Sequence, residues 1–362
     1  MGLVHDQFVL AGHHVDYFCA EDVPAHFRGR WARFSFPLLV RHKARIAARS
    51  GQPYDLINVH EPVSAAIAAW KSAAGNPLVV VTSHGIERRG WDLSVEDLRL
   101  GREGPSLKTR LIYPMTSLWQ SSLGLHHADH IFCLSFQDRD YLTQKLSIPQ
   151  SKITRIYPAA DPIYASVAKE RDYTRADRLL FFGTWLKRKG TDDLVAAFTV
   201  LAARHPELKL MVVGAGMPED IVRADFPGDL RTRVMCLPTT TEETVAAALA
   251  AADIFILPSL FEGTPQTLIE AMVSGMPVVT TSTSGMRDVI HDGENGLLVP
   301  IRSSDAIIAA VARLISDSAL RSKLGRMAHT DALQNYTWER VAVPVREAYE
   351  QLWEKNNGRV VR

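Results

Sequence analysis

Two glutamates, Glu262 and Glu270, lie eight residues apart in the stretch FEGTPQTLIEAM, which follows an apolar run. Pro265 suits the first turn of a helix, because the N–H group that proline lacks would have no partner there. Gly275, with Pro277 two residues later, is typical of a helix end. The sequence therefore predicts a loop that holds Glu262 and a helix, beginning near Pro265, that holds Glu270.

The start of this predicted helix has the residues needed to bind a phosphate group. The N–H groups of Gln266, Thr267 and Leu268 are expected to be free for phosphate oxygens, and the helix dipole adds roughly 0.3–2 kcal/mol. Gly263 would let a ligand approach the backbone closely. A carboxylate at Glu270 can accept two hydrogen bonds from a vicinal diol such as ribose, each worth roughly 1.5–3 kcal/mol.

Together these residues predict a clamp for a nucleoside-diphosphate sugar. The ribose would lie at Glu270, the diphosphate at the helix start and the sugar at Glu262. The two glutamates alone also fit a plainer interpretation, in which Glu262 is a charge at a helix N-terminus and Glu270 is a solvated helix residue.

Short apolar segments alternate with amphipathic segments along the chain and predict the elements that hold this site. Continuous strands rich in Val, Ile and Leu that alternate with helices indicate parallel sheets covered on both faces. Because the pattern occurs twice, we expect an α/β fold with two doubly wound, Rossmann-like domains facing across a cleft. The predicted strands are VDYFCA, DLINVH, LVVVTSH, HIFCLS and ITRIY, then LLFFG, LKLMVVG, VMCLP, IFILPS, PVVTT and GLLVP.

The predicted domains are an acceptor-side domain over residues 1–165, a nucleotide-sugar-binding domain over residues 166–337 and a C-terminal helix over residues 338–362. That helix either caps the second domain or crosses back to the first. Met1 falls inside the first predicted helix, without the strand and Gly-rich turn that open a doubly wound domain. The first domain is therefore expected to be truncated at its start.

The stretch from Ala252 to Pro300, with its segments SGMPVVTT and DGENGLLVP, resembles the family 4 glycosyltransferases, which are retaining enzymes with the GT-B fold. The resemblance extends from about residue 10 to residue 355. It implies that Glu262 contacts the donor sugar and that Glu270 holds the ribose. The segments YDLINVHEP and VVVTSHGIE are similar to the first domain of that family, which implies that His84 lies beside the donor sugar.

The segment LLFFGTWLKRKG resembles the strand and basic loop that open the second domain of this family. There an Arg and a Lys neutralise the diphosphate. Lys189 matches the Lys, whereas Thr184 occupies the position of the Arg. Either Lys187 or Arg188 would supply the second charge; the alternative is a solvated basic loop.

The resemblance implies transfer of a sugar, with retention, from a UDP- or GDP-sugar to an acceptor glycan, lipid or small molecule. His84, Glu262 and Lys189 would be the catalytic residues, with no cofactor and no metal. Front-face substitution is expected, because no second acidic residue is evident for a double displacement. One alternative is an inactive nucleotide-sugar-binding subunit or truncated paralogue; another is an epimerase or phosphorylase on the same fold.

The net charge and the apolar segments of the chain restrict the partners and the cellular location that we expect. The formal net charge of +1 gives no reason to expect nucleic-acid binding. The chain has neither a signal-peptide pattern nor an apolar run long enough to span a bilayer, which predicts a cytoplasmic location. Peripheral contact with a membrane is compatible with these features, and the oligomeric state is left open.

Overall fold

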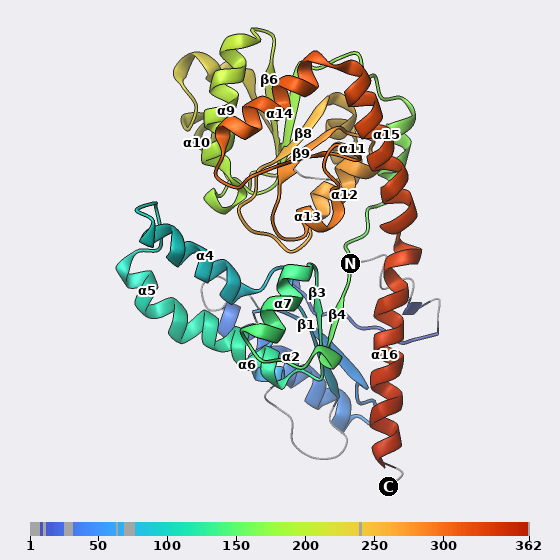
Figure 1. The fold of residues 1–362 in the computed structure, drawn as a ribbon. Coiled ribbons are helices and arrows are strands. Elements are labelled where there is room, and N and C mark those ends of the chain that lie inside the picture. Colours follow the sequence, from blue (N-terminus) through green and yellow to red (C-terminus); the bar gives the residue numbers. More distant parts are fainter. Residues whose placement is uncertain are drawn as a thin grey trace. The chain divides into compact units, whose positions relative to one another are not determined.

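A computed structural model describes residues 8–9, 12–24, 32–62, 64–68, 77–238 and 241–360 of the chain. The chain divides into two compact units, shown in Figure 1. Unit 1 comprises Met1–Ile156 and Ala342–Arg362, and unit 2 comprises Tyr157–Val341. Each unit is built on its own parallel sheet, which confirms the predicted α/β class with two Rossmann-like domains.

Unit 1 contains a four-stranded parallel sheet in the order β1-β2-β3-β4. Its strands are β1 (Leu56–His60), β2 (Leu78–Thr82), β3 (His130–Cys133) and β4 (Ile153–Arg155). Its helical segments are η1 (Ala20–Asp22), α2 (Ala32–Arg49), α3 (Ala65–Ala68), α4 (Glu87–Arg99), α5 (Leu107–Tyr113), η4 (Pro114–Leu118), α6 (Trp119–His127), α7 (Phe136–Gln144), η5 (Gln150–Lys152) and most of α16 (Trp338–Val360).

The two central strands of unit 1 are buried along their full length, as the unbroken apolar runs predicted. The core of unit 1 consists of more than one cluster. One cluster contains Val81, Ile131 and Leu125. In a second cluster, Val80 and Phe132 pack against residues of α16 that include Val345, Ala348 and Tyr349. The part of the last helix that follows Ala342 therefore belongs to the core of unit 1.

The predicted strand VDYFCA is wrong, because residues 15–19 have no regular structure. Polar groups of this segment bind side chains instead of a neighbouring strand. Lys43 Nζ donates to the Tyr17 carbonyl at 3.0 Å, and the N–H of Cys19 donates to Asp22 at 2.7 Å. Of the first predicted helix only residues 8–9 are described as helix, and the start of the chain lies outside the described residues.

Unit 2 contains a six-stranded parallel sheet in the order β10-β9-β8-β5-β6-β7. Its strands are β5 (Arg178–Phe182), β6 (Lys209–Val213), β7 (Val234–Leu237), β8 (Ile254–Leu257), β9 (Val278–Thr281) and β10 (Leu297–Val299). Its helical segments are α8 (Ile163–Lys169), η6 (Lys187–Lys189), α9 (Thr191–Arg204), α10 (Glu219–Ala224), η7 (Gly228–Arg233), α11 (Glu242–Ala251), α12 (Gln266–Val273), α13 (Met286–Val289), α14 (Ser304–Ser316) and α15 (Ser318–Asn335).

The middle of this sheet is the point where the strand order reverses. From β5 the chain proceeds outward to β6 and β7, and it then returns to β8, on the other side of β5, before proceeding to β9 and β10. In open parallel sheets, ligands bind outside the carboxyl ends of the strands at such a reversal. The loops that follow β5 and β8 are therefore the expected binding site of unit 2.

No helix in the described part of the chain is long and apolar enough to cross a membrane.

Candidate active site

The loop after β5 carries the basic residues singled out in the sequence. It leads into the 3₁₀ turn η6, which contains Arg188 and Lys189 and ends at Gly190. Gly190 has a left-handed backbone (φ +72°), and a Cβ atom there would lie 2.0 Å from the carbonyl oxygen of Pro258. Only glycine therefore permits this contact between the loop after β5 and the loop after β8. The N–H of Leu260 also joins the two loops by donating to the Arg188 carbonyl at 2.8 Å.

Glu262, in the loop after β8, is nearly buried and points at these cations. Lys189 Nζ lies 2.5 Å from Glu262 Oε1, and Arg188 Nη1 lies 3.3 Å from the same oxygen. The Ser259 hydroxyl donates to that oxygen as well, at 3.3 Å. The side chain of Lys189 is as enclosed as that of Glu262, whereas that of Arg188 is half exposed. The loops thus bring a buried ion pair and a half-exposed second cation to the carboxyl ends of β5 and β8.

The backbone around Glu262 is fixed by the loop after β9. The N–H of Glu262 donates to Ser284 Oγ at 3.4 Å, and the N–H of Gly285 donates to the Gly263 carbonyl at 2.7 Å. A Cβ atom on Gly285 would lie 2.2 Å from that carbonyl oxygen, so the two loops touch through their backbones. Gly263 is buried in this contact. Ser284 has a left-handed backbone (φ +51°), a conformation that costs free energy and is often found at functional sites.

The helix after this loop begins one residue later than predicted. Pro265 is extended (ψ 127°) and caps α12, whose first residue is Gln266. The prediction of a free N–H at Leu268 is wrong, because this group donates to the Pro265 carbonyl at 3.2 Å to close the first turn. The N–H groups of Gln266 and Thr267 have no partner among the described residues, so the predicted free donors at this helix start are reduced to these two.

Glu270 is buried in the second turn of α12, with only 5% of its surface exposed. Gln266 Nε2 donates to its Oε1 at 3.0 Å, whereas its Oε2 is buried without a hydrogen-bond partner. Burial raises the pKa of Glu270 to about 7, and the charges of Glu242 and Asp161 add to this effect. The plainer interpretation of Glu270 as a solvated residue is therefore wrong.

His84 lies in unit 1, directly after the carboxyl end of β2. Its Nε2 atom is 2.6 Å from Nδ1 of His60, the last residue of β1, and the two rings are stacked. Burial lowers the pKa of His60 to about 4, with a further contribution from His84, and loss of hydration lowers the pKa of His84. One neutral imidazole therefore donates its N–H to the other, and this hydrogen bond orients the ring of His84.

Comparison with known proteins shows the family of the chain. Residues 5–163 match the sequence profile of the family described as Glycosyltransferase Family 4, and residues 176–317 match the profile described as Glycosyl transferases group 1. The chain belongs to glycosyltransferase family 4.

The relatives of this family 4 glycosyltransferase include enzymes with different names. The phosphatidyl-myo-inositol mannosyltransferase of Mycolicibacterium smegmatis is 27% identical over 333 residues, which are 91% of this chain and 79% of the relative. The alpha-D-kanosaminyltransferase of Streptomyces kanamyceticus is 23% identical over 314 residues, which are 83% of this chain and 77% of the relative.

Solved structures show the same GT-B fold. The sucrose-phosphate synthase of Thermosynechococcus elongatus matches with a TM-score of 0.71 and 22% identity, over 92% of this chain and 81% of its own. The Anabaena protein HepE, solved in complex with UDP, matches with a TM-score of 0.66 and 18% identity, over 86% of this chain and 82% of its own.

The predicted site residues of unit 2 thus converge on the loops after β5 and β8 and on the start of α12. Thr184 lies in the first of these loops, where the resemblance implied an Arg. Its own carbonyl accepts from the N–H of Leu186 at 2.9 Å. The half-exposed Arg188 follows in the same loop, where its Nη1 atom lies 3.3 Å from Glu262 Oε1. The described residues contain no cluster of His, Cys, Asp and Glu able to hold a metal ion.

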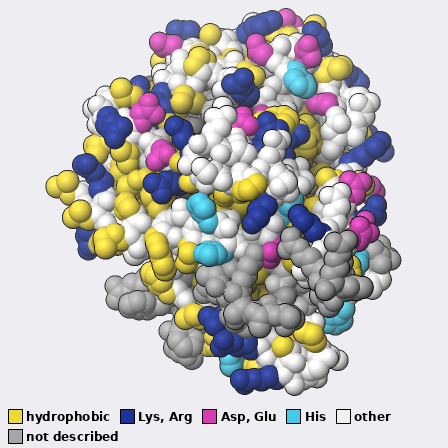
Figure 2. All heavy atoms as spheres, turned by 60° about the horizontal axis from the view of Figure 1, so that its bottom comes forward, with side chains coloured by type: hydrophobic (Ala, Val, Ile, Leu, Met, Phe, Trp, Pro, Cys, Tyr) yellow, Lys and Arg dark blue, Asp and Glu magenta, His cyan; other side chains and the backbone are white. Residues whose placement is uncertain are grey.

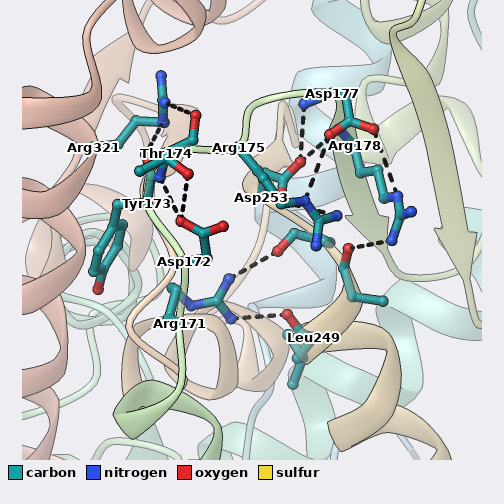
Figure 3. Close-up of polar contacts among 12 residues, drawn as sticks. Arg171, Asp172, Tyr173, Thr174, Arg175, Asp177, Arg178, Leu249, Asp253 and Arg321 are labelled. Carbon is teal, nitrogen blue, oxygen red and sulfur yellow. Dashed lines mark hydrogen bonds and ion pairs between the residues drawn. The ribbon is translucent and has the colours of Figure 1, made fainter.

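Arg171 and Asp253 anchor the elements that carry the site (Figure 3). The guanidinium of Arg171 donates to the carbonyls of Leu249 and Ala252, at the end of α11, and of Ser274, at the end of α12, each at 2.8 Å. Asp253, just before β8, accepts from the N–H groups of residues 177 and 178 at the start of β5, both at 2.9 Å. These bonds position α12 and align the two strands whose loops form the site.

Glu61 is a residue that the sequence analysis missed. It follows His60, accepts from the Ser121 hydroxyl, and accepts from the N–H of Glu87 at 3.2 Å. Its other oxygen is buried without a hydrogen-bond partner, and burial raises its pKa to about 7. The signal was present in the segment VHEP, where two titratable residues stand at the carboxyl end of a predicted strand.

Proposed function

We propose that this glycosyltransferase transfers a sugar, with retention of the anomeric configuration, from a UDP- or GDP-sugar to an acceptor glycan, lipid or small molecule. A lipid acceptor is supported by the relative from Mycolicibacterium smegmatis, whose name gives phosphatidyl-myo-inositol as its acceptor. A UDP donor is supported by HepE, which was solved with UDP.

The observation that carries the proposal is the environment of Glu270. A buried carboxylate that lacks a partner for one oxygen costs free energy, so its presence needs a compensating function. A ribose supplies the two neighbouring hydroxyl donors that such a carboxylate lacks. Glu270 lies about one helical turn after the free N–H groups of Gln266 and Thr267, which fit the adjoining diphosphate.

Lys189 is the group proposed to stabilise the leaving diphosphate. Its ammonium has three N–H donors, of which Glu262 uses one or two, so it can bind a phosphate oxygen without leaving Glu262. Arg188 adds a second cation from the half-exposed side of the same turn. Charge that develops on the diphosphate during bond cleavage would be stabilised by cations already in position.

We infer a front-face substitution for the transfer step. The bond between the anomeric carbon and the diphosphate oxygen breaks, the acceptor oxygen bonds to the same face, and the acceptor proton passes to the departing diphosphate. The contacts of Glu262 support this proposal, because a carboxylate that accepts from Lys189, Arg188 and Ser259 is a poor nucleophile for a covalent intermediate. Glu262 would instead contact the donor sugar.

The test combines donor binding with product stereochemistry. Calorimetry with UDP- and GDP-sugars should show binding that Glu270→Gln weakens and that Glu294→Gln, an exposed control in the same unit, leaves unchanged. Proton NMR of the product formed from an α-linked donor should show an α-linkage. A β-linked product would disprove retention, and equal binding by Glu270→Gln would disprove the ribose assignment.

An inactive nucleotide-sugar-binding subunit is the second candidate, and Thr184 favours it because the resemblance implied a cation at that position. Release of UDP or GDP in the presence of a panel of glycan and lipid acceptors separates the two candidates. Donor binding without any release, by an enzyme that remains folded, would favour the subunit.

A further inference from the structure

A continuous helical stretch in unit 1, from Leu107 to His127, exposes an apolar face to solvent. Leu107 is 75% exposed, Leu111 71%, Met115 79% and Trp119 58%. Because these residues follow one another at intervals of four, they lie along one side of the helical stretch. Ile112, also exposed, widens this side. We call these five residues the apolar stripe.

The stripe contributes nothing visible to the core of unit 1. Every residue from 106 to 112 is exposed, and the stretch is held in the core from Ser117 onward. Leu118 and Gln120 are buried, as are Gly124 and Leu125. Gly124 fits against Ser64 so closely that a Cβ atom would lie 1.9 Å from the Ser64 hydroxyl. Five large apolar side chains on the open side are then an exposed patch of the kind that marks a contact with another molecule.

The charged side chains on the stretch itself are of one sign, although the exposed Glu103 precedes it and Glu87 of α4 accepts from the Tyr113 hydroxyl. Residues 104–128 include no Asp or Glu, whereas Lys108 and Arg110 lie among the stripe residues. Both cations are exposed and have no carboxylate partner among the described residues, and the same holds for Arg99 at the end of α4. Figure 2 shows hydrophobic and basic side chains gathered along its left edge, where α4 and α5 lie in Figure 1.

We propose that the apolar stripe and its cations are a docking surface for an anionic lipid bilayer. The stretch would lie in the plane of the interface, with the apolar side chains among the acyl chains and with Lys108, Arg110 and Arg99 at the lipid phosphates. Trp119 has the indole typical of a membrane interface. A second copy of the chain fits the stripe poorly, because two such surfaces would bring like charges together. This inference is independent of the proposed transfer reaction.

Flotation with phosphatidylcholine vesicles, with and without phosphatidylglycerol, tests the surface. The full chain should float with the anionic vesicles and stay in solution with neutral ones, and added salt should release it. Leu111→Glu with Met115→Glu should lower the partition coefficient by roughly tenfold or more. Met327→Glu, at an exposed methionine of α15, is the matched control and should bind as the wild type does.

Separate variants test the contribution of the basic residues to membrane binding. Lys108→Glu with Arg110→Glu should weaken binding to anionic vesicles by roughly twentyfold or more, since each basic residue contributes about fivefold at such a surface. Arg313→Glu, at an exposed arginine of α14, is the control for a change of net charge. Because all these residues are exposed, the thermal unfolding of every variant should match that of the wild type.

Trp119 gives an independent readout on the wild-type fold. Lipids with brominated acyl chains should quench part of the tryptophan fluorescence, and Trp119→Phe should remove that quenched part. The proposal is overturned if the wild type does not bind anionic vesicles, or if the double variant Leu111→Glu with Met115→Glu binds them as strongly as the wild type does. It is also overturned if sedimentation shows a wild-type dimer that this variant abolishes, since a second copy then covers the stripe.

Discussion

Lys189 Nζ lies 2.5 Å from Glu262 Oε1, and this buried ion pair joins the loop after β5 to the loop after β8. Each residue compensates the charge of the other in a place that water hardly reaches. Removing one partner of such a pair leaves an uncompensated charge and typically costs about 3–5 kcal/mol of stability. Arg188, 3.3 Å from the same oxygen, would offset part of this loss.

Lys189→Ala should lower turnover roughly 100-fold or more while weakening donor binding by less than about tenfold. The reason is that the diphosphate gains negative charge only as the bond breaks, so Lys189 stabilises the transition state more than the bound donor. Calorimetry and steady-state kinetics measure the two effects separately. Lys187→Ala, at a largely exposed residue of the same turn, is the control.

A rise in the dissociation constant of the donor with kcat unchanged would contradict this role for Lys189. The residue would then be a uniform binding contact.

Glu270→Gln should weaken donor binding by roughly 10- to 100-fold, because the ribose loses hydrogen bonds to a charged acceptor. The binding should also depend on pH. Since burial raises the pKa of Glu270 to about 7 in the free protein, acid keeps the group protonated and less able to accept from a diol. Donor affinity should therefore rise as the pH increases through about 7 and level off above it.

Calorimetry over this pH range measures the effect, and Glu270→Gln should abolish the part that is due to Glu270. An affinity that falls with rising pH, or a variant that retains the full pH dependence, would show that the ribose does not bind at this carboxylate.

The fold was largely predictable because its central strands are buried on both faces and read as unbroken apolar runs. The segment VDYFCA is also rich in apolar residues, apart from Asp16, but it has no regular structure, because composition does not reveal whether a neighbouring strand is available. For the site, the spacing of Glu262 and Glu270 left two interpretations open, and the resemblance to family 4 glycosyltransferases was needed to predict that Lys189 shares a donor site with them.

What the sequence could not reveal are contacts between residues that the sheet brings together. His60 and His84 are 24 residues apart in the chain, and the parallel register of β1 and β2 places them side by side. The hydrogen bond from the Leu268 N–H to the Pro265 carbonyl also depends on backbone geometry. It forms where Pro265 is extended and caps the helix.

Arg171→Leu should lower the free energy of unfolding of unit 2 by about 3 kcal/mol, because it leaves three carbonyls at helix ends without their donor. Urea unfolding followed through unit 2 measures this loss. Arg204→Leu, at an exposed residue of α9, is the control and should change stability by less than about 0.5 kcal/mol. A loss of the same small size in Arg171→Leu would mean that water replaces the guanidinium without cost.

His60 and Glu61 are neighbours in the chain and should give unit 1 opposite dependences of stability on pH. The pKa of His60 is lowered from 6.5 to about 4, so the unfolded chain binds more protons in that window and the contribution of His60 to stability rises with pH. The pKa of Glu61 is raised from 4.5 to about 7, so the folded chain binds more protons and its contribution falls with pH. Over the shared window, from pH 4.5 to 6.5, the two effects oppose each other.

Single variants should separate these effects. Relative to the wild type, His60→Asn should make the stability of unit 1 decline more steeply as the pH rises from 4.5 to 6.5, and Glu61→Gln should make it increase. Each change in slope should be at most about 1.4 kcal/mol per pH unit, the value for one proton. Hydrogen exchange of the buried strands β2 and β3 at several pH values reports on unit 1 alone. A variant that leaves the slope unchanged would mean that the replaced group titrates in the folded protein as it does in the unfolded chain.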